Sequence, residues 1–142
     1  MSRAHLVRIA ATLCLVTGAG HVVGTFMAVP PGQTDMHAAI ATMKATRVPM
    51  PVGTPRTYMQ ILDGNNLCTA VLLLLAAALL FAIAGPPDAP ATDRVLVVTS
   101  VALAAFSVIS SFYFFPVPAV FTGVAAVLCL VARSRSRPSP RS

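Results

Sequence analysis

The stretch Leu67–Ala84 reads LCTAVLLLLAAALLFAIA and contains no charged side chain. A helix needs roughly 20 apolar residues to cross the ~30 Å hydrocarbon layer of a bilayer. The polar residues just before Leu67 extend this stretch to that length. Three more apolar runs accompany it, over Leu6–Val29, Val95–Phe115 and Val117–Ala132. The sequence therefore predicts an all-α protein, a transmembrane four-helix bundle.

The composition agrees with a chain that lies mostly inside a membrane. Its mean hydropathy is +0.80. Its charged fraction of 10% is far below the ~25% of soluble domains. We predict one four-span domain over residues 1–132, with spans at about 6–29, 55–84, 95–115 and 117–132. Residues 133–142 are rich in Arg, Ser and Pro and are predicted to form a disordered, basic cytoplasmic tail.

The distribution of basic residues predicts the orientation. Basic residues close to the ends of spans stay in the cytoplasm. Most of them flank one side of the predicted bundle, which places both termini in the cytoplasm and Pro30–Asn66 outside. The external segment still carries Lys44, Arg47 and Arg56, a mild departure from the rule. The seven residues on the cytoplasmic side are Arg3, Arg8, Arg94, Arg133, Arg135, Arg137 and Arg141.

Proline and glycine mark the boundaries of the first two spans. The Pro30–Gly32 segment stops the first helix. Asp35 is the predicted N-cap of a short amphipathic helix over Met36–Arg47, which lies along the membrane surface. Thr54 followed by Pro55 predicts the start of the second span, because proline suits the first helical position.

Similar signals mark the last two spans. The Gly85–Pro87 segment ends the second span, and Thr92 or Asp93 is the predicted cap of the third. Proline disfavours the helical conformation of the residue before it. The two prolines in Phe115–Pro118 therefore predict a tight external turn, with the second proline near the first turn of the last helix.

Each predicted span carries a stripe of small or polar residues at heptad-like spacing. Helices in membranes associate through small residues and polar contacts, because lipid is as apolar as leucine. Gly20 and Gly24 form a GxxxG pattern that predicts a close approach of the first span to a neighbour, and Gly123 is assigned the same role in the last span. The stripes comprise Ala10, Cys14, Thr17, Gly20, His21, Gly24 and Ala28, then Asp63, Asn66, Ala70, Ala77 and Ala84, then Ser100, Ala104, Ser107 and Ser111, and finally Ala119, Gly123, Ala126 and Cys129.

Several polar side chains are not needed for packing, and they form the candidate binding site. Ionisable groups inside spans are costly and face the bundle interior or a water-filled cavity. Counting ~1.5 Å per helical residue places His21, Asn66, Ser111 and Tyr113 at one level, in the outer third of the membrane. Asp63 lies just above that level. The predicted pocket residues are His21, Arg56, Tyr58, Asp63, Asn66, Ser111 and Tyr113.

Two interpretations of this polar cluster remain open. In the first, its members hydrogen-bond across helices and serve packing alone. In the second, they line an outer-leaflet pocket for a lipid headgroup, a quinone or a small polar molecule. A histidine beside an aspartate also suits proton transfer. Haem ligation is disfavoured because His21 is the only histidine inside a span. No cofactor or metal is therefore predicted.

Other functional classes have little support in the sequence. The three cysteines, Cys14, Cys68 and Cys129, are widely spaced and are best explained as small buried hydrophobic residues. No nucleophile–base pair or phosphate-binding glycine loop is present, so the chain is predicted not to be an enzyme. No nucleic-acid-binding motif is present either.

The order of short motifs resembles a group of small bacterial four-span membrane proteins. The resemblance rests on Gly20-His21-x-x-Gly24, on Arg56-Thr57-Tyr58, and on Tyr113–Ala119 with its YFFPxPA pattern. The stretch after Tyr58 lacks the aromatic residues common in that group. The chain is also similar, more distantly, to four-helix membrane proteins of the DoxX type, for which redox-linked roles are suggested. The resemblance implies a four-helix bundle in the bacterial inner membrane and supplies no activity.

Together these features predict a small inner-membrane protein that binds a lipid, quinone or small polar molecule. The alternative is a scaffold or accessory subunit of a larger membrane complex. The expected partners are membrane lipids, and either a second copy of the chain or another membrane protein.

Overall fold

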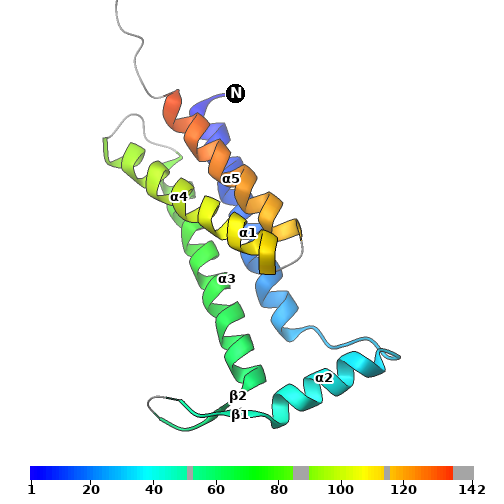
Figure 1. The fold of residues 1–142 in the computed structure, drawn as a ribbon. Coiled ribbons are helices and arrows are strands. Elements are labelled where there is room, and N and C mark those ends of the chain that lie inside the picture. The colour runs from blue at the N-terminus through cyan, green and yellow to red at the C-terminus, as the bar shows by residue number, and fades with distance from the viewer. Residues whose placement is uncertain (51–52, 85–89, 114–115, 136–142) are drawn as a thin grey trace, which may run out of the picture.

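The fold is described by a computed structural model, which covers residues 1–50, 53–84, 90–113 and 116–135. It is all-α apart from two very short strands, which confirms the predicted fold class (Figure 1). The elements in chain order are α1 (Arg3–Phe26), α2 (Thr34–Ala45), β1 (Arg47–Val48), β2 (Arg56–Thr57), α3 (Tyr58–Ile83), α4 (Pro90–Tyr113) and α5 (Pro116–Ser134).

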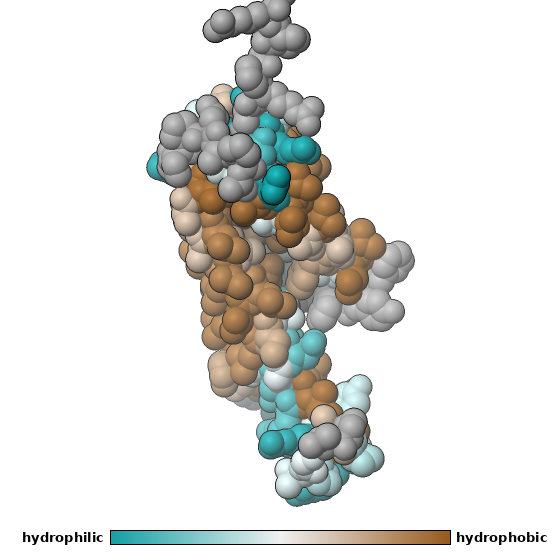
Figure 2. Space-filling view, turned by 90° about the vertical axis from the view of Figure 1, so that its left-hand side faces the viewer, coloured by the Kyte–Doolittle hydropathy of each residue, from teal (hydrophilic) through white to brown (hydrophobic). Residues whose placement is uncertain are grey.

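Four of the helices, α1, α3, α4 and α5, are long and apolar enough to cross a membrane. Hydrophobic side chains cover the middle of the molecule, whereas hydrophilic ones gather at its two ends (Figure 2). Large side chains such as Leu72, Val98 and Val101 are more than 60% exposed in the middle of these helices, as expected for surfaces that face lipid. The chain is therefore a multi-pass membrane protein with four spans.

The four spans pack in the order α3, α1, α5, α4. Contacts are extensive between α1 and α3, between α1 and α5, and between α4 and α5. The helices α3 and α4 are consecutive spans but contact each other little, and Figure 1 shows them diverging. The bundle is consequently open along one side, between α3 and α4.

Alanines and other small side chains, together with several leucines, form the tightly packed core, which lies mainly in the half of the bundle that holds the start of α1 and the end of α5. The buried apolar cluster includes residues of α1 from Leu6 to Cys14 and residues of α5 from Ala125 to Ala132. Ala70 and Ala77 of α3, and Ala84 directly after it, are at most 5% exposed, at the heptad spacing seen in the sequence. Small residues allow helix backbones to approach closely, which is the main source of helix association in lipid.

The glycine of α1 that packs closely is Gly18, and it is not part of the predicted GxxxG pattern. A Cβ placed on Gly18 would meet Leu74 Cγ at 3.1 Å and Leu73 Cβ at 3.2 Å. A Cβ on Gly20 or Gly24 would have no atom within 4 Å. Gly20 and Gly24 therefore make no close helix contact within this chain, contrary to the prediction, because they lie on another side of α1 than Gly18.

Two serine side chains connect α4 to α5. Ser100 Oγ donates a hydrogen bond to the carbonyl of Ala126, and Ser107 Oγ donates one to the carbonyl of Ala119, both at 2.7 Å. Gly123 faces this contact, since a Cβ there would lie 2.9 Å from Ser107 Oγ. Hydrogen bonds between helices supply polar attraction that apolar packing in lipid lacks.

The segment between α1 and α3 differs from its prediction. β1 and β2 pair antiparallel, with Arg47 opposite Thr57 and Val48 opposite Arg56. This pairing keeps the chain extended through Thr57, which therefore caps α3 in place of Thr54. The Thr57 side chain and the Gln60 side chain form a reciprocal capping box.

The starts of two other helices also differ from prediction. Gln33, and not Asp35, is the N-cap residue of α2, which ends at Ala45 because Arg47 joins β1. Thr92 and Asp93 lie inside the first turn of α4, which begins at Pro90. The predicted stop at residues 85–87 lies outside the described residues.

The last helix is longer than predicted at both ends. Pro116 and Pro118 lie in its first turn and not in a separate turn, because backbone N–H groups there have no helical partner to lose. At its other end α5 continues to Ser134, so the predicted tail begins later than residue 133. Arg135 donates a hydrogen bond to the carbonyl of Met1, which joins the two chain ends.

Candidate functional site

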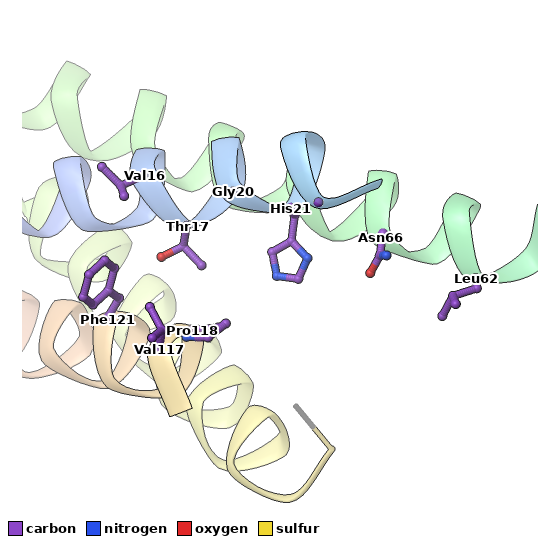
Figure 3. Close-up of a pocket in the computed structure, with 10 residues that line it drawn as sticks. Val16, Thr17, Gly20, His21, Leu62, Asn66, Val117, Pro118 and Phe121 are labelled. Carbon is purple, nitrogen blue, oxygen red and sulfur yellow. The ribbon is translucent and has the colours of Figure 1, made fainter. Parts of the chain in front are cut away.

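A cavity of about 460 Å³ lies between α1, α3 and α5, in the half of the bundle opposite the chain termini (Figure 3). It begins where the small-residue core ends, and the segment with α2, β1 and β2 lies at this end of the molecule. The lining residues are Val16, Thr17, Gly20, His21 and Gly24 of α1, Leu62 and Asn66 of α3, and Val117, Pro118 and Phe121 of α5.

The cavity exists because α1 presents glycine there instead of side chains. The buried residues of α1 extend as far as Gly18, whereas Gly20 and Gly24 are exposed and face open space. Side chains at these two positions would enter the cavity. The glycines therefore serve the cavity, in place of the packing predicted for them.

His21 and Asn66 are the polar pair of the cavity. The Asn66 amide lies within hydrogen-bonding reach of the His21 imidazole, so α3 and α1 each contribute one member. The edge of the His21 ring also contacts Phe106 of α4, with ring centroids 6.3 Å apart and planes at 82°. Edge-to-face contacts of this kind hold a ring in a defined orientation. The imidazole is thus positioned from two neighbouring helices.

The rest of the wall is almost entirely apolar. Thr17 is the third polar residue, but its hydroxyl donates to the carbonyl of Leu13 at 2.8 Å within α1. No Asp, Glu, Lys or Arg lines the cavity among the residues that the structure describes. In the same described ranges, no three His, Cys, Asp or Glu side chains converge as metal ligands would. The cavity can therefore offer hydrogen bonds from an imidazole and an amide in apolar surroundings.

Of the six predicted pocket residues whose side chains the structure describes, two line the cavity, His21 and Asn66. Asp63 is half-buried on α3 but does not line the cavity. Ser111 is exposed, and its hydroxyl donates to the carbonyl of Ser107 on its own helix. Arg56 is exposed in β2, and Tyr58 is 52% exposed at the start of α3. The side chain of Tyr113 lies outside what the structure describes.

No sequence signal marked the contribution of the last span. Val117, Pro118 and Phe121 line the cavity, yet apolar side chains in an apolar span do not stand out. The contact of Phe106 with His21 was not predicted for the same reason. In contrast, the glycine spacing around His21 did mark the correct stretch of α1.

Comparison of the chain with protein-family models, with curated proteins and with solved structures gives no match.

Proposed function

We propose that this four-span membrane protein binds a small amphipathic molecule in the cavity between α1, α3 and α5. The observation that carries the proposal is the His21–Asn66 pair in an otherwise apolar cavity. A volume of about 460 Å³ falls within the ~300–1,000 Å³ range of small-molecule sites. Such sites combine apolar walls with a few polar groups that orient the ligand. No serine, cysteine or carboxylate accompanies the imidazole among the described lining residues, which favours binding over catalysis.

His21→Leu is expected to abolish or strongly reduce retention of a co-purifying small molecule. The variant loses a hydrogen bond worth about 1–1.5 kcal/mol, which corresponds to a roughly tenfold loss of affinity. Native mass spectrometry of protein extracted in mild detergent measures the bound fraction. The matched control is His37→Leu, because His37 is exposed on α2 and lies outside the cavity. Wild-type protein that carries no small molecule, and arrives with a protein partner instead, would favour a scaffold.

We infer that both termini face the cytoplasm of a bacterial cell, with α2 and the two strands outside. Seven of the ten basic residues lie on the side of the termini, which is the arrangement that the positive-inside rule favours. Single cysteines at His5 and Gln33, both exposed, test this with a membrane-impermeant maleimide on intact cells. We expect labelling at Gln33→Cys and protection at His5→Cys. The opposite pattern would reverse the orientation.

A further inference from the structure

We propose that the ligand is a neutral amphiphile with one long hydrocarbon chain, and that this chain lies in the open groove between α3 and α4. The inference rests on the proposed function and adds a second binding site for the same molecule. Phe106 lies between the cavity and the groove, so the hydrocarbon chain of the ligand must pass this residue.

The groove is an apolar depression in the open side of the bundle. Its volume is about 360 Å³, and Thr69 and Thr99 are its only polar residues within the described ranges. It exists because α3 and α4 make few contacts with each other. The lining comprises Thr69, Leu72, Leu73, Leu75, Ala76 and Leu79 of α3, with Val98, Thr99, Ala102, Leu103 and Phe106 of α4.

The groove lies next to the cavity that contains His21. On α3, Asn66 lines the cavity and Thr69 lines the groove, one helical turn further along. On α4, Phe106 lines the groove while its ring contacts the ring of His21. Residues of both α3 and α4 therefore place the cavity next to the groove. A ligand whose head group binds at His21 can extend its hydrocarbon chain past Phe106 and along α3.

The shape and chemistry of the groove suit a flexible hydrocarbon chain better than a helix. Its rims carry large side chains, among them Leu72 and Leu75 of α3 and Val98 of α4, all more than half exposed. Helices in membranes pack through small residues, and the alanines Ala70 and Ala77 of α3 are already buried inside the bundle. The groove spans residues 69–79 of α3, which is ~15 Å along the helix and half of the hydrocarbon layer.

The head group of the ligand should be uncharged. The described residues of the cavity include no charged side chain, and an unpaired charge in apolar surroundings is very costly. An imidazole and an amide suit a carbonyl or hydroxyl group, which can accept or donate hydrogen bonds. A prenylated quinone and a monoacylglycerol both combine such a head with one chain. A phospholipid does not.

The test compares chain-bearing and chainless probes on the full-length protein in mild detergent. The probes are a prenylated benzoquinone, the same benzoquinone without its chain, a monoacylglycerol and a phosphatidylglycerol, titrated by calorimetry. Ala102→Phe fills the groove from α4 and should weaken binding of a chain-bearing probe roughly tenfold, or about 1.4 kcal/mol. It should leave the chainless quinone unaffected. His21→Leu should weaken every probe that binds wild type.

Ala104→Phe is the matched control, because Ala104 is exposed on the same helix but lies outside the groove. Tighter binding of one neutral chain-bearing probe over the other identifies the source of the ligand. Equal affinity for probes with and without a chain, unchanged by Ala102→Phe, overturns the groove while leaving the cavity intact. Preference for phosphatidylglycerol overturns the neutral head. Failure of all probes to bind wild type would reject the proposed function itself.

Discussion

Gly18→Leu is expected to be the most destabilising single substitution in the membrane-spanning part of this protein. Gly18 is buried where α1 crosses α3, and even a Cβ there would lie 3.2 Å from Leu73 Cβ. That atom is bonded directly to the α3 backbone, so it cannot move aside as the end of a side chain can. A leucine must therefore push the two helices apart, and such overpacking costs about 1–3 kcal/mol or more. Thermal unfolding in detergent, followed by loss of helical circular dichroism, measures the change.

Gly24→Leu is the control for this experiment, and it tests the choice between two neighbouring glycines. Nothing lies within 4 Å of a Cβ on Gly24, so its stability should change by no more than about 0.5 kcal/mol. The same variant places a side chain in the cavity, so it should retain the fold and lose the ligand. If Gly24→Leu unfolds as readily as Gly18→Leu, the GxxxG pattern mediates packing after all, in a contact with another chain.

The number and nature of the spans could be predicted because they depend only on local properties. A run such as Leu67–Ala84 must be helical in lipid, since the backbone has no water with which to hydrogen-bond. The burial of Ala70, Ala77 and Ala84 also followed from spacing, because a heptad repeat keeps residues on one face. The strand pairing of Arg47–Val48 with Arg56–Thr57 could not be predicted, since two-residue strands have no periodicity.

The candidate site was only partly predictable. The sequence predicts how deep each residue lies in the membrane, but it does not predict how each helix is rotated about its own axis. The fixed rise of a helix placed His21, Asn66 and Ser111 at one level. Which way each side chain faces depends on how its helix is rotated against its neighbours. On α4 that rotation is set by Ser100 and Ser107, which bond to α5, and it leaves Ser111 exposed. His21 and Asn66 meet because α1 and α3 pack directly on each other.

The contact between α4 and α5 predicts a second large effect: substitutions at Gly123 and Ser107 should affect stability non-additively. Gly123→Ala would place a methyl group 2.9 Å from Ser107 Oγ and force that hydroxyl away from the Ala119 carbonyl. The lost hydrogen bond and the crowding together should cost about 1–2 kcal/mol. Ser107→Ala alone should cost only about 0.6 kcal/mol, the usual value for a hydrogen bond between membrane helices.

The double variant Ser107→Ala, Gly123→Ala should be about as stable as Ser107→Ala alone, because removing the hydroxyl removes the clash. The next atom, Ser107 Cβ, is 3.7 Å from the added methyl group, which is ordinary contact. The cycle therefore predicts a coupling free energy of about 1 kcal/mol or more, measured from the unfolding of all four proteins in one detergent. Gly20→Ala is the matched single control, since it faces open space. Strictly additive effects would show that α5 approaches α4 through some other pair of residues.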